Sequence, residues 1–349
     1  MRETQTGTEE LVMVVHGPEA FDSGDAARMI AAVHPERVVV AGVMGRTAAE
    51  ESGIRCEYAG LPPSRVIPGI EGRIFMLNRG KTAESGRIFG GIVASRLGEP
   101  GLLHVECSNG CIYCWNRESD DLSDYLASAT GYPVLQVRTG EVTNTNVREI
   151  RGCIPGEAVF VDGIVIGRAR DTKVVLTQEN GRIVPLSGLI PKIHGLEKIH
   201  RRGCLDVTKA WCKSGPVRRA DPVTSTQRRD EGLVVYIDHC GHELYSRVDD
   251  RTCGVVSVGD DTTAVCGHIG AHLGLPVLGV VDGDGDDVVG PRFAPGSVIL
   301  HVLEGRDDDL GLEIRDKISD SPVKWMEFVK DIISSLGPRV SVEIPGHPD

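Results

Sequence analysis

The feature that most constrains the fold is a set of three apolar, β-branched runs in the last third of the chain, each followed by acidic residues. Runs of this kind predict buried strands of an α/β sheet. The acids then lie at the carboxyl ends of the strands, where such sheets place ligands. Because clustered carboxylates repel one another, they usually need a cation. The runs and their acids are residues 255–258 with Asp260 and Asp261, residues 277–281 with Asp282 and Asp284, and residues 298–303 with Glu304 and residues 307–309.

The rest of the chain shows the same alternation of strand and helix patterns, with one interruption. Residues 11–140 alternate in this way, which favours a mostly parallel sheet with covering helices. Asp162-Gly163 and Asn180-Gly181 then each separate two apolar runs, which predicts two β-hairpins. Residues 192–230 are basic and predict a connector with one helix that faces the acidic part.

We therefore predict an α/β protein with two Rossmann-like, three-layer domains and a small β-hairpin module between them. The predicted parts are residues 1–150 for the N-terminal domain, 151–230 for the β module and basic connector, and 231–349 for the C-terminal Rossmann-like or Toprim-like domain.

The charge and the cysteine content limit the classes of function. A net charge of −12 over 349 residues disfavours non-specific nucleic-acid binding, which needs a basic surface. The polar first residues and the absence of a long apolar run predict neither a signal peptide nor a membrane span. We expect a reduced, cytoplasmic protein whose 10 cysteines are thiols, metal ligands or cluster ligands.

The second acid cluster suggests a metal site, and the residues directly after the first cluster suggest a phosphate site. Asp282 and Asp284 flank a glycine and can reach one metal ion, and hard oxygen ligands favour Mg²⁺. Thr262 and Thr263 stand at the start of a predicted helix, where hydroxyls and free N–H groups suit a phosphate. The predicted Mg²⁺ ligands are Asp260, Asp261, Asp282 and Asp284, with Asp238 as the likeliest additional one.

The third acid cluster is harder to place, because its strand follows a short, glycine- and proline-containing connection. A parallel crossover with a helix needs at least about 10–12 residues. An antiparallel course would move Glu304 and residues 307–309 to the opposite edge, so we expect a site on two strands. An acid on one strand followed by Asp-x-Asp on another resembles the Toprim fold of nucleotidyl-transfer enzymes, although Asp238 stands where that fold has Glu.

Three cysteines offer a different chemistry. Cys107, Cys111 and Cys114 have the Cys-x3-Cys-x2-Cys spacing of radical SAM enzymes, and this resemblance implies a [4Fe–4S] cluster. The predicted hairpins after residue 156 leave no room for the long series of β/α units of that family. A non-radical cluster or a Zn²⁺ site with a fourth ligand such as Cys56 or Cys153, and simple structural thiols, are the alternatives.

Two segments of the first domain lie at predicted strand ends. Lys81 and Thr82 follow a strand in Arg-Gly-Lys-Thr, but the first glycine of a P-loop is missing, so we expect at most a phosphate contact. His16 to Glu19 follow the first strand, at a position where ligands bind in such sheets.

Several segments together resemble an uncharacterised protein family of methanogenic archaea. The resemblance implies an archaeal cytoplasm and supplies no reaction. The segments are residues 15–19, 78–82, 161–167, 192–198, 259–263 and 282–284.

Our leading hypothesis is divalent-metal-dependent binding or turnover of a phosphorylated ligand or nucleotide at the C-terminal acidic edge. The alternatives are an iron–sulfur or zinc protein that uses the three cysteines, and a non-catalytic subunit whose acidic face binds a basic protein partner.

Overall fold

The fold is α/β, as predicted, and it divides into two compact units, residues 1–143 and 144–349. The computed structural model describes residues 9–140, 147–201, 203, 206–208, 210, 212–227, 229–282 and 293–345. Within these ranges no helix is both long and apolar enough to cross a bilayer.

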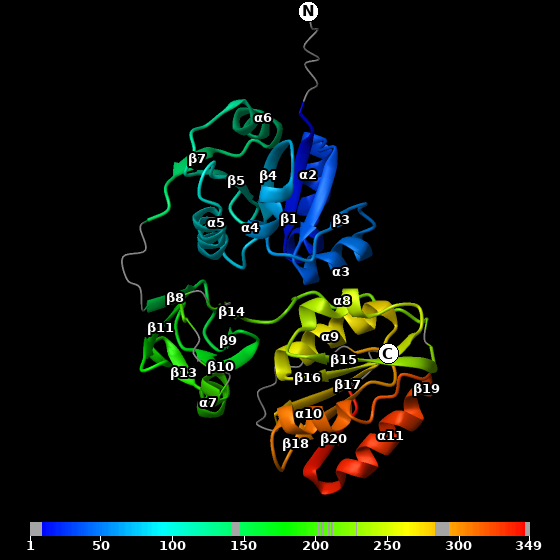
Figure 1. The fold of residues 1–349 in the computed structure, drawn as a ribbon. Coiled ribbons are helices and arrows are strands. Elements are labelled where there is room, and N and C mark those ends of the chain that lie inside the picture. The colour runs from blue at the N-terminus through cyan, green and yellow to red at the C-terminus, as the bar shows by residue number, and fades with distance from the viewer. Residues whose placement is uncertain are drawn as a thin grey trace, which may run out of the picture. The chain divides into compact units, whose positions relative to one another are not determined.

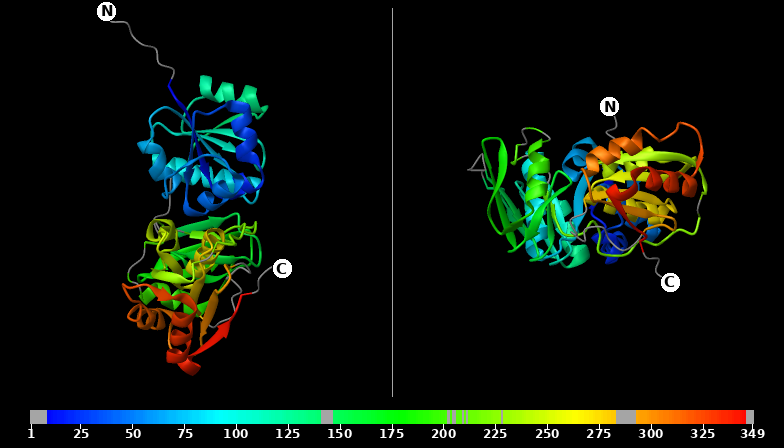
Figure 2. Two further views of the ribbon diagram at one scale, coloured as in Figure 1. Left: turned by 90° about the vertical axis from the view of Figure 1, so that its right-hand side faces the viewer. Right: turned by 90° about the horizontal axis from the view of Figure 1, so that it is seen from below.

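Unit 1 is a mixed sheet with helices on both faces (Figures 1 and 2). Its strand order is β3-β2-β1-β4-β5-β6-β7, and the part up to β5 is parallel. The elements are β1 (Leu11–His16), α1 (Glu19–Asp22), α2 (Asp25–Val33), β2 (Arg37–Ala41), α3 (Val43–Ser52), β3 (Glu57–Tyr58), α4 (Pro63–Val66), η1 (Ile67–Gly69), β4 (Arg73–Asn78), α5 (Ala83–Leu97), β5 (Leu102–Glu106), β6 (Cys111–Trp115), α6 (Asp121–Thr130) and β7 (Val134–Val137).

The sequence of unit 1 explains its layers. Val12 to Val15 of β1 are all fully buried, because a parallel strand covered on both faces reads as a continuous apolar run. Thr82 begins α5 as a capping residue whose side chain accepts a hydrogen bond from the Ser85 N–H. Helices α1 and α2 pack on one face of β1, and α5 packs on the other face of β4.

The first part of unit 2 contains the two predicted hairpins. Asp162 and Gly163 have φ of 47° and 79°, and Asn180 and Gly181 have 51° and 76°. These left-handed pairs form the tight turns that join antiparallel strands, so both hairpin predictions are confirmed. The elements are β8 (Val147–Arg151), β9 (Ala158–Val161), β10 (Ile164–Ala169), β11 (Lys173–Glu179), β12 (Arg182–Ser187), β13 (Leu189–Pro191), α7 (Ile193–Arg201) and β14 (Cys212–Ser214).

The second part of unit 2 is a sheet in the order β19-β15-β16-β17-β18-β20. Ser257 and Gly279 face α9, whereas Val256 and Val258 face α10 and α11, so helices cover both sides (Figure 1). The elements are β15 (Glu231–Asp238), η2 (Gly241–Glu243), α8 (Leu244–Arg247), β16 (Thr252–Val258), α9 (Asp260–Leu273), β17 (Val277–Asp282), β18 (Val298–Val302), α10 (Asp307–Arg315), β19 (Val323–Lys324), α11 (Trp325–Leu336), η3 (Gly337–Arg339) and β20 (Val340–Glu343).

The expected two-strand limit of the acidic site was wrong. Strand β18 runs parallel to β17, and β15, β16 and β17 are parallel to one another as well. The connection extends from the end of β17 to the start of β18, residues 283–297, which exceeds the length that a crossover needs. The acids after β18 therefore lie at the same edge as those after β16 and β17.

Candidate functional site

The carboxyl ends of β15, β16, β17 and β18 bring together acids that are far apart in the sequence. We call this region the carboxyl edge of unit 2. Asp238 ends β15, Asp260 opens α9 directly after β16, and Asp282 ends β17. Asp307 and Asp308 open α10 after β18. The edge thus contains three of the predicted residues and two that the sequence argument had set aside.

A buried lysine compensates part of this negative charge. Lys198 on α7 is buried, and its Nζ forms an ion pair with the buried Asp307 and lies 3.8 Å from Asp282 Oδ2. Helix α7 can approach this closely because Gly195 packs on β10, where a Cβ would lie 1.9 Å from the Val165 oxygen. The prediction that the basic connector faces the acidic part is confirmed by these contacts.

Two acids at this edge, Asp260 and Asp282, have raised pKa values. Burial raises the pKa of Asp260 to about 7, against the attraction of Lys192, and the neighbouring Asp282 adds to the rise. Lys192 Nζ lies 3.9 Å from Asp260 Oδ2. Burial and the carboxylate of Asp307 likewise raise the pKa of Asp282, against the attraction of Lys198. Ionisation of all the carboxyl groups at this edge therefore costs free energy.

Asp261 belongs to a different contact from Asp260. Its Oδ1 accepts a hydrogen bond of 2.5 Å from Lys213 Nζ, and Lys213 also lies over the Phe160 ring, 4.6 Å from its centroid. Successive residues of a helix point about 100° apart, so two adjacent aspartates at a helix start face different neighbours. Asp261 thus joins β14 to α9 and leaves Asp260 at the edge.

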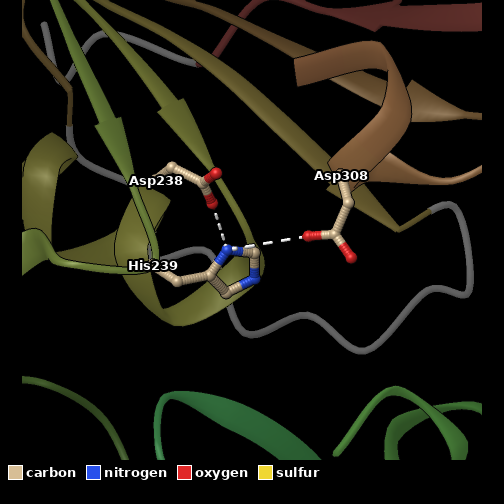
Figure 3. A group of neighbouring side chains, drawn as sticks. All are labelled: Asp238, His239 and Asp308. Carbon is tan, nitrogen blue, oxygen red and sulfur yellow. Dashed lines mark hydrogen bonds and ion pairs between the residues drawn. The ribbon is translucent and has the colours of Figure 1, made fainter. Parts of the chain in front are cut away.

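Asp238, His239 and Asp308 form a compact group of metal-ligand type (Figure 3). One ligand atom from each side chain lies within 4.8 Å of the other two, and within the described ranges no other group of three His, Cys, Asp or Glu does so. The His239 ring lies between the two carboxylates, with Nδ1 2.5 Å from Asp238 Oδ1 and 3.8 Å from Asp308 Oδ1. One imidazole nitrogen and two carboxylate oxygens are a ligand set for a divalent ion.

The conformation of His239 is unusual for a residue that only fills space. Its φ is +51°, which residues other than glycine rarely adopt, and its side chain is 7% exposed. Its Nε2 is buried and has no hydrogen-bond partner among the described residues. The ring packs against Gly259, where a Cβ would lie 2.7 Å from Nε2. The backbone thus holds the imidazole between the acids with Nδ1 as the atom that faces them.

The predicted phosphate residues have other partners. Thr263 is fully buried, and its Oγ1 lies 2.9 Å from Ser257 Oγ, while its N–H donates to the Gly259 carbonyl. Thr262 is buried in the same turn of α9. Thr82 caps α5 in unit 1, next to Lys81. Asp284 lies outside the described residues.

The three cysteines do not converge. Cys111 and Cys114 stand three residues apart on β6, so they point to opposite faces of the sheet. Cys114 and Cys107 belong to the core under α2 and α6, whereas Cys111 packs with Tyr113 and Trp115 on the side of α5. Strand alternation therefore separates thiols that look adjacent in the sequence.

His239 and the lysines were not predicted as members of this site, and Asp308 had been set aside with the third acid cluster. A signal existed for His239, because it directly follows Asp238 at the end of a predicted strand. For Lys198 the signal was only general, namely that the basic connector faces the acidic part, since the docking of α7 decides which lysine reaches the sheet.

Comparison with known proteins identifies relatives but no activity. Residues 13–322 match the family described as "Uncharacterized protein conserved in archaea (DUF2117)". A protein of Methanocaldococcus jannaschii, "Uncharacterized protein MJ0065", is 31% identical over 325 residues, which is 86% of this chain and 88% of the relative. No solved structure matches the chain.

We predict that Lys198→Met destabilises unit 2 by about 3–5 kcal/mol, because it leaves buried carboxylates without their counter-charge. The free energy of unfolding is measured by urea denaturation with tryptophan fluorescence. Lys330→Met, at an exposed position of α11, is the control and should change stability by less than about 0.5 kcal/mol. Adding Asp307→Asn to Lys198→Met should recover part of the loss. Equal effects of the two lysine variants would contradict this role of Lys198.

We also predict a pH dependence caused by Asp260. Its pKa is about 7 in the folded protein and 3.8 in the reference state, so the folded state binds the additional proton between these values. Stability then falls as pH rises through this window, by at most about 1.4 kcal/mol per pH unit, and levels off above it. Asp260→Asn should remove this component, so that its stability relative to the unchanged protein increases between pH 4 and 7.

The measurement is a series of urea unfolding curves from pH 4 to pH 8. Asp331→Asn, at an exposed position of α11, controls for the loss of one carboxylate. A stability difference between Asp260→Asn and the unchanged protein that does not vary with pH would refute the raised pKa.

Proposed function

The chain belongs to this conserved archaeal family, and we propose that the carboxyl edge of unit 2 binds a divalent metal ion and, through it, a phosphorylated small molecule such as a nucleotide. The observation that carries the proposal is the group Asp238, His239 and Asp308, whose ligand atoms lie within 4.8 Å of one another. This position at the ends of parallel strands is where α/β sheets bind ligands.

The chemistry of the three ligands determines which metal ions fit the site. Carboxylates alone favour Mg²⁺, but the imidazole nitrogen of His239 extends the choice to Mn²⁺, Fe²⁺ and Zn²⁺. Asp238 and Asp308 are half-buried, so the group is not closed off from solvent. Three protein ligands leave coordination positions for water and for an oxygen of the bound molecule.

The surroundings favour an anionic ligand. Lys192 and Lys198 place two ammonium groups beside Asp260 and Asp282. Helix α9 begins at Asp260, directly after Gly259, and the N-terminus of a helix attracts phosphate. A metal ion adds positive charge and neutralises phosphate oxygens.

Turnover of a phosphoester is the reaction class that this edge supports. Burial gives Asp260 a pKa of about 7, so its carboxyl group can exchange a proton near neutral pH. Such a group is suited to general acid–base catalysis beside a metal-bound phosphate. The cysteine-based alternative has no comparable support, since Cys111 and Cys114 face opposite sides of their sheet.

We predict that the protein binds one Mn²⁺ per chain and that Asp308→Asn abolishes this binding. Isothermal titration of the full chain with Mn²⁺, Mg²⁺ and Zn²⁺ measures the affinity, and the rise in melting temperature with metal gives an independent readout. Asp309→Asn is the matched control, because Asp309 is exposed and pairs with Arg306. Binding that survives in Asp308→Asn, or no binding in the unchanged protein, would refute the metal site.

We further predict that ADP or pyrophosphate binds only when the metal is present. Lys192→Met should weaken this binding by roughly tenfold, as expected for the loss of a charge-assisted contact of about 1.4 kcal/mol. Metal affinity should stay within a factor of two, since Lys192 is not a metal ligand, and Lys330→Met serves as the distant control. If the protein binds metal but the metal does not change the binding of ADP or pyrophosphate, the metal site is supported and the phosphorylated ligand is disproved.

A further inference from the structure

Unit 1 has a strand topology that is typical of ligand-binding α/β sheets, and it does not involve the proposed metal site of unit 2. Its strand order reverses between β1 and β4, and the helices that follow these two strands pack on opposite faces of the sheet. In open α/β sheets, the crevice outside the carboxyl ends of two such strands is the place where ligands bind. We call this place the switch point of unit 1.

A histidine and an asparagine end the two strands at the switch point. His16 is the last residue of β1, Asn78 is the last of β4, and the two are paired in register. His16 Nδ1 lies 3.0 Å from Asn78 Oδ1. An amide oxygen only accepts hydrogen bonds, so Nδ1 carries the proton and donates it. The other ring nitrogen, Nε2, therefore holds the free electron pair.

A buried carboxylate fixes the orientation of this pair. Asn78 Nδ2 donates to Glu106 Oε2 at 2.6 Å, which assigns the amide oxygen to His16. Glu106 is fully buried and also accepts the N–H groups of Gly80 and Ser108, each at 2.9 Å. Burial opposes its ionisation, but these hydrogen bonds and the His104 ring, whose Nε2 lies 3.4 Å from Glu106 Oε2, outweigh burial and lower the pKa of Glu106. The carboxylate is therefore charged.

Helix α5 accommodates this network through its glycines. A Cβ on Gly86 would lie 2.1 Å from Glu106 Oε2, and one on Gly90 would lie 2.1 Å from His104 Nδ1. Any larger residue at these positions would move α5 away from β5. The two glycines thus leave room for the buried Glu106 carboxylate next to the His16–Asn78 pair.

The second ring nitrogen of His16, Nε2, takes no part in this network. Within residues 9–140, which are described without a gap, no group hydrogen-bonds to Nε2, and this atom is not among the buried polar atoms without a partner. The ring is half-buried and stacks on Phe89 with centroids 4.0 Å apart. Burial, and to a lesser degree His104, lowers the pKa of His16, against the effects of Asn78 and Glu106. The imidazole is therefore neutral at physiological pH.

We propose that His16 is the general base of a second small-molecule site at the switch point of unit 1, with Asn78 as its positioning residue. Nε2 takes a proton from a hydroxyl group or a water molecule: an N–H bond forms, the O–H bond breaks, and its electron pair stays on the oxygen. The resulting imidazolium is stabilised through Asn78 by the Glu106 carboxylate. The ligand is a small hydroxyl-bearing molecule, or a compound attacked by the activated water.

The strand ends exclude a dinucleotide of the usual kind. Strand β2 ends in Ala41 and is followed by Gly42, so no acid stands directly after this strand, where a ribose hydroxyl would be bound, and His16-Gly17-Pro18 lacks the glycine fingerprint after β1. A Cβ on Gly42 would contact nothing within 4 Å, whereas one on Gly17 would lie 3.1 Å from Glu19 Oε2. The open side of this edge therefore lies at Gly42, and the Glu19 carboxylate lies beside Gly17.

Carbethoxylation of the full-length protein by diethyl pyrocarbonate tests the proposal, because this reagent acylates an unprotonated, accessible imidazole nitrogen. Modification of each histidine is followed by peptide mass spectrometry from pH 5.5 to pH 8, with the exposed His34 as the reference. At pH 5.5 a histidine with the ordinary pKa of about 6.5 keeps roughly one tenth of its maximal rate. His16 should keep a fraction of its maximal modification rate that is several times larger than this at pH 5.5. An unreactive His16, or one with the pH profile of His34, would overturn the proposal.

The tautomer gives a second, independent readout. The ¹⁵N shifts of the imidazole, assigned with His16→Gln, should show a protonated Nδ1 and an unprotonated Nε2 in the unchanged protein. Asn78→Ala should abolish this preference, since it removes the acceptor of the Nδ1 proton. A protonated Nε2 in the unchanged protein, or an unaltered tautomer in Asn78→Ala, would contradict the assigned roles. Neither measurement involves metal, so the outcome is separate from that for unit 2.

Discussion

The ion pair between Lys198 and Asp307 is the interaction on which the arrangement of unit 2 depends. An ammonium group buried in the protein must be paired, and Lys198 has Asp307 in direct contact and Asp282 at 3.8 Å. These acids come from the end of β17 and the start of α10, whereas the lysine comes from α7 of the hairpin module. The pair therefore fixes the module against the sheet and, in the same contact, places positive charge among the carboxylates.

Much of the fold followed from local rules that the sequence states openly. Asp162-Gly163 and Asn180-Gly181 specify tight turns because both residues of each pair adopt positive φ, and the buried parallel strands read as apolar runs. Two features did not follow. Strand β6 was hidden because Cys111 and Cys114 suggested ligands rather than strand residues. The direction of β18 depended on where β17 ends, and strand ends are the least certain part of such a prediction.

The site was predictable only as a location. Acids at strand ends must gather at one edge of a parallel sheet, so Asp238, Asp260 and Asp282 could be placed there without a structure. Which acid meets which partner depends on rotation and docking. Asp261 follows Asp260 directly, yet the turn of α9 directs it to Lys213. The contacts made by α7 are likewise long-range, and no periodicity in the sequence encodes them.

The two units place polar residues at the same kind of sheet edge but balance their charge differently. In unit 1, Glu106 is fully buried and satisfied by N–H groups, so its charge needs nothing further. In unit 2, the acids at this edge outnumber the lysines beside them, and burial raises the pKa of Asp260 to about 7, so a proton can supply part of the missing positive charge. The divalent ion that we propose beside His239 would supply it as well. Proton and metal would then compete as counter-charges for one edge, because each reduces the repulsion between the buried carboxylates.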